Sequence, residues 1–149
     1  MISTDVIVVY LALLMHNEPK EDGVNGQRAC GLVVRNRVNA GWGEWIQVIK
    51  DHDKYSGRRD VDKTKPRVLE LGDPLRDESF RRCIEIAGNI VSGMEKDITK
   101  GALRYCRLDQ CSEEFAEKVV RPTKVNPENG ATELIHNRVA TVGQQQFFK

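Results

Sequence analysis

The chain has 149 residues, of which 40% are hydrophobic and 30% charged, enough apolar material for one domain with a buried core. The 23 basic residues nearly balance the 22 acidic ones, which gives no electrostatic basis for binding nucleic acid or an anionic membrane surface. We expect a single domain over residues 1–149, without a nucleic-acid partner and working as a monomer.

The N-terminal stretch predicts a core helix over residues 4–17. Its apolar run, residues 6–15, is too short to span a bilayer, which takes about 20 residues, so no membrane insertion is expected. No Lys or Arg precedes that run, and Asp5 stands where a signal peptide carries positive charge. The sequence therefore predicts no signal peptide, and a protein made in the cytoplasm.

A polar loop and a second helix follow. Pro19 and Gly23 predict a loop over residues 19–25, because Pro blocks continuation of the first helix and Gly favours a turn. Residues 26–39 are predicted to form the second helix, since apolar side chains recur there at the spacing of one helical face.

The rest of the chain predicts shorter elements. Helices are expected over residues 45–50, 77–93 and 112–120, and loops over residues 51–66 and 121–130. Residues 97–107 indicate a turn into a short extended segment, and the tail ends in a small hydrophobic cluster. The predicted fold class is mainly α, or α+β with at most a small sheet.

The four cysteines divide into two kinds of position. Cys30 and Cys83 lie on apolar helix faces, where a thiol behaves as a small hydrophobic group. Cys106 and Cys111 have no neighbouring His or second Cys pair that would complete a zinc site. A disulfide between them is possible in an oxidising compartment, but the missing export signal favours reduced thiols.

Patterns for a metal site or a phosphate loop are missing from the sequence. The histidines at 16, 52 and 136 do not pair at helical spacing with another ligand, and the glycines at 23 and 26 lack the frame of a phosphate loop. No nucleophile elbow surrounds any Ser, although a Ser-His-Asp or Cys-His triad stays open as an alternative. We expect no metal and no cofactor. Acid–base chemistry by carboxylates is then the main enzymatic option.

Glu18 is the first candidate for that chemistry. A Glu near a helix end is most often a surface residue, but partial burial beside a cleft would raise its pKa and keep a proton ready for a leaving oxygen. Glu21 and Asp22, in the same loop, are the competing acids.

Several segments in chain order resemble the cell wall hydrolases of the spore-cortex-lytic type, a family related to lytic transglycosylases with a lysozyme-like fold. The resemblance covers almost the whole chain and is carried by Glu18, Gly26-Gln27, Ala29 and Asn36-Arg37-Val38, by Val48 with Lys54-Tyr55-Ser56, by the block at 97–105, and by the tail at 142–148. It implies a single lysozyme-like catalytic domain.

The chain also departs from the family pattern. The family's E-A-R-G-E around the acid appears as Glu18-Pro-Lys-Glu21-Asp22, and Gln145 stands in place of a closing His. The resemblance therefore implies a divergent member. Without a signal peptide, such a protein would reach the wall by release from the cell, as in phage lysis or on a virion.

The resemblance implies cleavage of peptidoglycan between N-acetylmuramic acid and N-acetylglucosamine. Glu18 would protonate the glycosidic oxygen and then act as base. Lytic transglycosylases need only this acid, because the 6-hydroxyl of muramic acid attacks and leaves a 1,6-anhydro product. A hydrolytic muramidase would need a second carboxylate, for which Asp22, Asp53 and Asp97 are candidates.

The resemblance also implies roles for residues around the acid. Substrate contacts fall to Tyr55, Ser56, Tyr105 and Gln145, and supporting positions to Asn36, Arg37, Asp97 and Thr99. Buried hydrogen bonds that fix helix packing suit Asn36 and Arg37 equally well, and Asp97 suits a cap on the turn to Gly101. For Trp42 and Trp45 core packing is favoured over sugar stacking.

A non-enzymatic alternative stays open. The altered acid loop and the missing His equally fit a degenerate domain that binds glycan or a protein partner without cleaving it.

Overall fold

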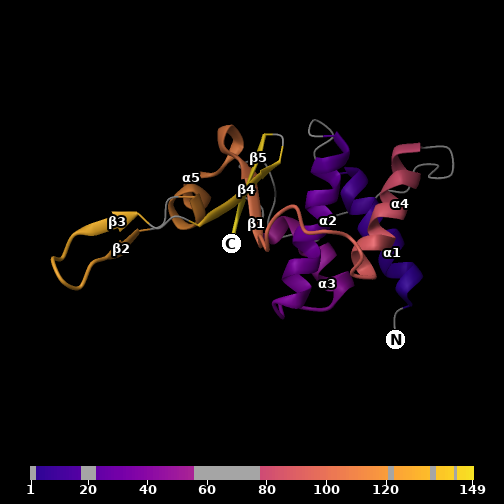
Figure 1. The fold of residues 1–149 in the computed structure, drawn as a ribbon, viewed down its shortest axis with the longest axis horizontal. Coiled ribbons are helices and arrows are strands. Elements are labelled where there is room, and N and C mark those ends of the chain that lie inside the picture. The colour runs from indigo at the N-terminus through magenta and orange to yellow at the C-terminus, as the bar shows by residue number, and fades with distance from the viewer. Residues whose placement is uncertain (1–2, 18–22, 56–77, 121–122, 135–136, 143) are drawn as a thin grey trace.

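The computed structural model describes residues 3–17, 23–55, 78–120, 123–134, 137–142 and 144–149. It is mainly helical, with a small three-stranded sheet. Helices α1 to α4 pack together on one side, the sheet lies next to them, and a separate hairpin projects at the far side (Figure 1). The predicted α+β class is confirmed at this level.

The helical part is built from α1 (Thr4–Asn17), α2 (Gly23–Asn39), α3 (Trp45–Lys50) and α4 (Glu78–Val91). The predicted bounds of α1 are confirmed, and those of α4 differ by one or two residues. Aliphatic side chains fill the shared core, as the low aromatic content requires; its fully buried members include Leu11, Leu14, Met15, Leu32, Ile49 and Ile90.

Gly31 sets how closely α2 approaches its neighbours. A Cβ added there would lie 2.7 Å from Ile90 Cδ1 of α4 and 2.7 Å from Met15 Sδ of α1. Carbon atoms in good contact stay about 3.5–4.0 Å apart. A glycine inside a helix costs about 1 kcal/mol relative to alanine, so its place here is explained by the close packing that it allows.

The start of α2 corrects the sequence prediction. The predicted loop over residues 19–25 is wrong for its last three residues, because α2 begins at Gly23. Val24 packs against the helical core, and Asn25 Oδ1 accepts a hydrogen bond from Arg28 Nη1 at 2.5 Å. These contacts outweigh the turn preference of Gly and Asn.

Gly93 ends α4 as predicted. Its φ is 82°, a left-handed conformation that favours glycine. The Gly93 N–H donates to Ile90 O and the Met94 N–H to Asn89 O, which is the Schellman arrangement of a helix end.

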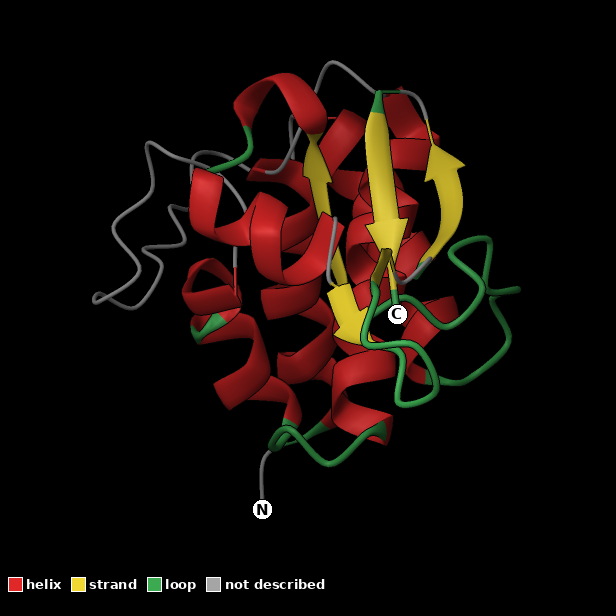
Figure 2. Ribbon diagram, turned by 90° about the vertical axis from the view of Figure 1, so that its left-hand side faces the viewer, coloured by secondary structure: helices red, strands yellow, loops and turns green. Residues whose placement is uncertain are grey.

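The sheet joins the middle of the chain to its tail. Strands β1 (Arg104–Arg107), β4 (Arg138–Val142) and β5 (Gln145–Phe148) are antiparallel in the order β1-β5-β4. They lie side by side against the helices (Figure 2). Phe147 of β5 packs on Ala29 and Val33 of α2, so the hydrophobic tail forms the central strand that fastens the sheet to the helical core.

The hairpin β2 (Thr123–Val125) and β3 (Thr132–Leu134) corrects a second prediction. The expected loop over residues 121–130 contains β2, because the turn residues Asn126, Pro127, Asn129 and Gly130 all follow the strand and form the hairpin turn. Within that turn Asn126 Oδ1 accepts from the Glu128 N–H, and Gly130 has a φ of 71°. The side chains of β2 are exposed, so no buried face marked the strand in the sequence.

A disulfide corrects a third prediction, the one on the state of two cysteines. Cys106 and Cys111 are joined, with their Cα atoms 6.0 Å apart, whereas the sequence favoured reduced thiols. The 3₁₀ turn η3 (Leu108–Gln110) after β1 brings the two residues together. The predicted helix that follows is confirmed as α5 (Glu113–Phe115) and the π-helical η4 (Ala116–Val120), capped by Ser112.

Candidate functional site

The candidate site lies where α2, the 3₁₀ turn η2 (His52–Tyr55) and β1 come together. Asn36 and Arg37, neighbours near the end of α2, both bind the segment at 97–105. That segment and the end of α2 carry two of the blocks that resemble the cell wall hydrolases, so the structure brings these blocks into direct contact.

Asn36 anchors the turn that precedes β1. Its Nδ2 donates to Asp97 Oδ2 at 3.1 Å, to Thr99 Oγ1 at 3.2 Å and to Ala102 O at 3.0 Å. Asp97 closes the same turn: its Oδ1 accepts from the Thr99 N–H and hydroxyl, and its Oδ2 accepts from the Gly101 N–H at 2.8 Å. The predicted cap on the turn to Gly101 is confirmed.

The electrostatics of Asp97 suit a fixed anion. Burial raises the pKa of its carboxyl, but hydrogen bonds from Thr99, Gly101 and Asn36 outweigh that effect and hold the pKa below its ordinary 3.8. Both oxygens accept hydrogen bonds within the turn. The group is therefore an ionised acceptor at neutral pH and is unsuited to donating a proton.

Arg37 is a charged side chain in the interior, with only 1% of its surface exposed. Its Nε donates to Leu103 O at 2.7 Å, and its Nη1 lies 3.3 Å from His52 Nδ1. Burial lowers the pKa of Arg37 from its ordinary value to about 10, which leaves it charged at neutral pH. These contacts fit the packing interpretation of the residue, since they fix β1 and η2 to α2.

Arg37 also determines the protonation of His52. A guanidinium only donates hydrogen bonds, so His52 Nδ1 must accept, and the ring is neutral with its proton on Nε2. That Nε2–H donates to the Tyr105 hydroxyl oxygen, 2.9 Å away. Tyr105 stacks on Phe147 with ring centroids 5.2 Å apart, so its phenol is fixed from two sides.

Two aromatic rings and two guanidinium groups form the wall beside this chain of hydrogen bonds. Trp42 and Tyr55 have ring centroids 4.6 Å apart. The Arg37 guanidinium carbon lies 5.4 Å from each ring centroid, and that of Arg104 lies 5.2 Å from the Trp42 centroid. Trp42 and Trp45 also pack against the helical core, as expected from the sequence.

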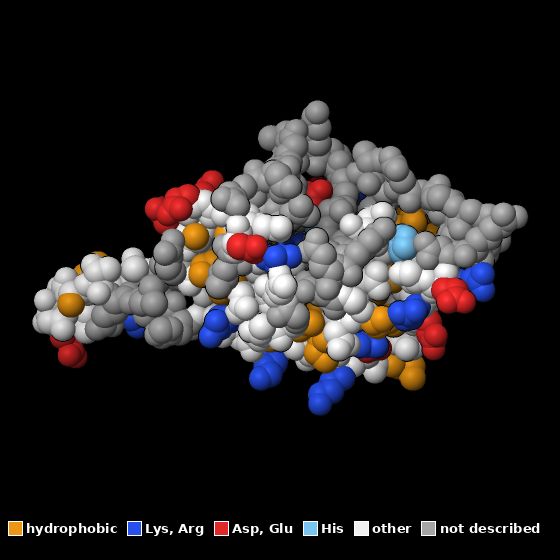
Figure 3. Space-filling model, turned by 90° about the horizontal axis from the view of Figure 1, so that it is seen from above, with side chains coloured by type: hydrophobic (Ala, Val, Ile, Leu, Met, Phe, Trp, Pro, Cys, Tyr) orange, Lys and Arg blue, Asp and Glu red, His pale blue; other side chains and the backbone are white. Residues whose placement is uncertain are grey.

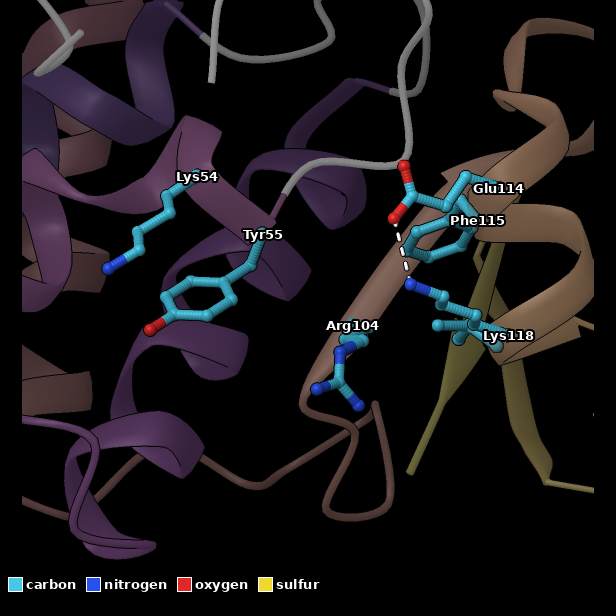
Figure 4. A pocket seen from close by; sticks show the side chains of 7 residues that line it. Lys54, Tyr55, Arg104, Glu114, Phe115 and Lys118 are labelled. Atoms are coloured by element: carbon cyan, nitrogen blue, oxygen red, sulfur yellow. Dashed lines mark hydrogen bonds and ion pairs between the residues drawn. The ribbon is translucent and has the colours of Figure 1, made fainter. Parts of the chain in front are cut away.

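An open depression of about 140 Å³ adjoins Tyr55 (Figure 4). Arg104 of β1 lies between Tyr55 of η2 and Lys118 of η4, and Phe115 and Val119 supply apolar surface. Lys118 forms an ion pair of 2.9 Å with Glu114, and both side chains are exposed. The depression therefore combines an aromatic wall with an excess of positive charge.

The predicted site residues fall into three groups. Asn36, Arg37, Asp97, Thr99 and Tyr105 are brought together, and Tyr55 joins them through Arg37. Gln145 is buried and pairs with Arg107 of β1. It lies two residues before Phe147 on β5, so the two side chains are on the same face of the strand. Glu18 and Ser56 lie outside the described residues.

The sequence missed His52 and Arg104 as parts of the site. The predicted loop over residues 51–66 is wrong at its start, because His52–Tyr55 form the 3₁₀ turn η2 and His52 is only 3% exposed. Residues 56–66 lie outside the described residues. The one signal in the sequence that could have placed His52 beside Tyr55 is their spacing of three residues, since side chains three apart lie on the same side of a 3₁₀ turn. The position of Arg104 follows from the pairing of β1 with β5, which the sequence does not specify.

Other kinds of site find little support in the described residues. They contain no group of three or more His, Cys, Asp or Glu side chains that could hold a metal ion. None of their helices has the length and apolar character to cross a membrane. On the face seen in Figure 3, basic and acidic side chains are interspersed rather than gathered into one basic patch.

A scan against protein-family models finds no match, and comparisons with curated proteins and with solved structures find none either. Membership of the cell wall hydrolases and the lysozyme-like fold therefore stay predictions from the sequence motifs.

Proposed function

We propose that this protein cleaves the glycan strands of peptidoglycan between N-acetylmuramic acid and N-acetylglucosamine, as a lytic transglycosylase with Glu18 as general acid and base. One observation carries the proposal: segments that resemble the family at distant places in the sequence meet in a single network. Arg37 links to η2 through His52, His52 links to Tyr105, and Tyr105 stacks on Phe147 of the tail. Such convergence is what we expect if these motifs mark one functional site.

The proposed mechanism needs one acid. Glu18, the residue after the end of α1, protonates the glycosidic oxygen, and the bond from that oxygen to the anomeric carbon of muramic acid breaks. The 6-hydroxyl of the same muramic acid attacks this carbon and gives its proton back to Glu18. The products are a 1,6-anhydromuramic end and a free hydroxyl on the leaving sugar, so no water is consumed.

The hydrogen bonds of Asp97 favour this route over hydrolysis. A hydrolytic muramidase needs a second carboxylate beside the bond. Asp97 uses both oxygens to close its turn, which makes it a poor partner for sugar or water. Asp53 of η2 and Asp22, which lies outside the described residues, are the carboxylates left for a hydrolytic mechanism.

The rest of the site supports a carbohydrate substrate. The partly exposed ring of Tyr55 lines the depression and offers aromatic surface against which the apolar face of a sugar ring can pack. The Cys106–Cys111 disulfide fits a protein that works in an oxidising place, such as the cell wall.

The test is digestion of purified peptidoglycan with the wild type and with Glu18→Gln, followed by mass spectrometry of the released muropeptides. We expect anhydromuramyl ends with the wild type and a loss of at least about 100-fold in rate with the variant, the usual contribution of a general acid. Glu21→Gln is the matched control and should keep its activity, because it removes the same charge three residues away.

Other outcomes would separate the alternatives. Equal activity of wild type and Glu18→Gln would show that Glu18 is not the catalytic acid. Reducing muramyl ends among the products would show that the enzyme is a hydrolase and not a transglycosylase. Gln145, which stands where the family has His, specifically favours a second candidate function: glycan binding without cleavage. In that case the protein would co-sediment with peptidoglycan while releasing no soluble fragments.

A further inference from the structure

The depression between η2 and η4 has the composition of a subsite for a carboxylate. Arg104, at its centre in Figure 4, is half-buried and belongs to a strand in register with Phe148 of β5. Its guanidinium rests on the Trp42 ring, 5.2 Å from the centroid, so its direction is set by a second side chain. A guanidinium held in this way presents two parallel N–H groups, the arrangement that binds a carboxylate through both oxygens.

The charges around Arg104 also favour an anion. Arg37 raises the positive potential from the interior; its partners are a backbone carbonyl, a neutral imidazole and aromatic faces. Lys54 and Lys118 add charge at the rim, where Glu114 pairs with Lys118. Among the described residues, no carboxylate forms an ion pair with Arg37 or Arg104. An incoming anion would therefore offset unbalanced positive charge.

We propose that this depression binds a free carboxylate of the peptide attached to muramic acid, with Arg104 as the residue that recognises it. The identity of the ligand rests on the proposed function, since peptidoglycan strands carry such carboxylates beside the muramic acid ring. Tyr55 would contact the sugar, and Phe115 and Val119 would contact the apolar side chain of the peptide. The protein would thereby prefer peptide-bearing strands over uncharged polymers of N-acetylglucosamine.

The experiment compares paired ligands that differ in one charge. Calorimetry measures binding of N-acetylglucosaminyl-N-acetylmuramyl-L-alanine and of its C-terminal amide to the full chain at fixed ionic strength. We expect the acid to bind about tenfold more tightly, the usual size of a charge-assisted hydrogen-bonded pair. Arg104→Gln should abolish this preference, and Arg104→Lys should restore part of it. Lys124→Gln in the exposed strand β2 is the matched control and should keep it.

A second measurement separates the subsite from the proposed function. The wild type is titrated with N-acetyl-alanine, N-acetyl-alaninamide and inorganic phosphate, while NMR follows the Arg104 Nε–H and Trp42 indole signals. Shifts with the acid alone, absent in Arg104→Gln, support the subsite even where no glycan binds or is cleaved. No shift with the acid overturns it, and so does tighter binding of phosphate. Equal affinity of the disaccharide acid and its amide overturns the subsite but leaves the glycan function standing.

Discussion

Asn36 and Arg37 are neighbours on α2 and hold the same downstream segment, but they do so with different electrostatics. Asn36 is neutral and donates a hydrogen bond to the ionised Asp97, whose negative charge is stabilised within the turn by backbone and side-chain donors. Arg37 is charged, and its partners among the described residues are a carbonyl, a neutral imidazole and aromatic rings. In this part of the chain the charge of Asp97 is matched by hydrogen-bond donors, whereas the charge of Arg37 is not matched by a carboxylate.

This difference suggests that the residues around Asn36 stabilise the fold, whereas those around Arg37 and Arg104 can bind a ligand. Hydrogen-bond donors and acceptors that are fully matched fix a backbone turn and leave little to offer a ligand. A cation that is held by neutral groups stays able to attract an anion, as does Arg104 next to it. We therefore expect changes on the Asn36 side to act mainly on folding, and changes around Arg104 to act mainly on ligand binding.

The largest expected effect comes from Asp97→Ala. The substitution removes the acceptor of the Thr99 and Gly101 N–H groups and one of the three acceptors of the Asn36 amide, which should cost about 3 kcal/mol of unfolding free energy. Urea denaturation followed by circular dichroism measures this loss. Asp109→Ala, which removes an exposed carboxylate paired with Arg107, should cost less than about 0.5 kcal/mol. Similar losses for both variants would contradict the structural role of the turn.

His52→Phe tests the Arg37 side and should have a smaller effect. The ring keeps its approximate shape, but the Arg37 and Tyr105 contacts lose their partner, for an expected cost of about 2 kcal/mol. A double-mutant cycle with Tyr105→Phe should give a coupling energy of about 1 kcal/mol, because the two residues share a hydrogen bond. In the wild type, ¹⁵N NMR should find the His52 proton on Nε2.

Two results would break that interpretation. Additive effects of His52→Phe and Tyr105→Phe would mean that the contact between them carries no energy. Loss of exchange protection at the Thr99 amide in His52→Phe would mean that the two sides are one cooperative unit rather than two.

The sequence predicted the helical part well, since α1 and α4 carry apolar patterns that local structure follows directly. It also identified the cap formed by Asp97, because an acid two and four residues before its N–H partners is a local arrangement. It failed where a strand shows no buried face, as in β2, and where contact depends on folding at a distance.

The candidate site shows the same division. Asn36, Arg37 and Tyr105 were found through their motifs, but their connection runs through His52, which nothing in its charged surroundings marks as buried. Arg104 becomes a central residue of the depression only when η2, β1 and η4 are placed together. The disulfide likewise depends on the η3 turn, whose effect on the two cysteines the sequence does not reveal.

The smallest expected effect is a dependence on pH that belongs to the Asn36 side alone. The pKa of Asp97 is lower in the folded chain than its ordinary 3.8, so the ionised carboxylate stabilises the fold. This contribution is complete above about pH 5 and is lost as the pH falls through 3.8 toward the lower, folded value. The difference in unfolding free energy between wild type and Asp97→Asn should therefore narrow between pH 5 and about pH 2. A difference that stays constant over this range would mean that the charge of Asp97 contributes nothing beyond the hydrogen bonds that a neutral side chain can also accept.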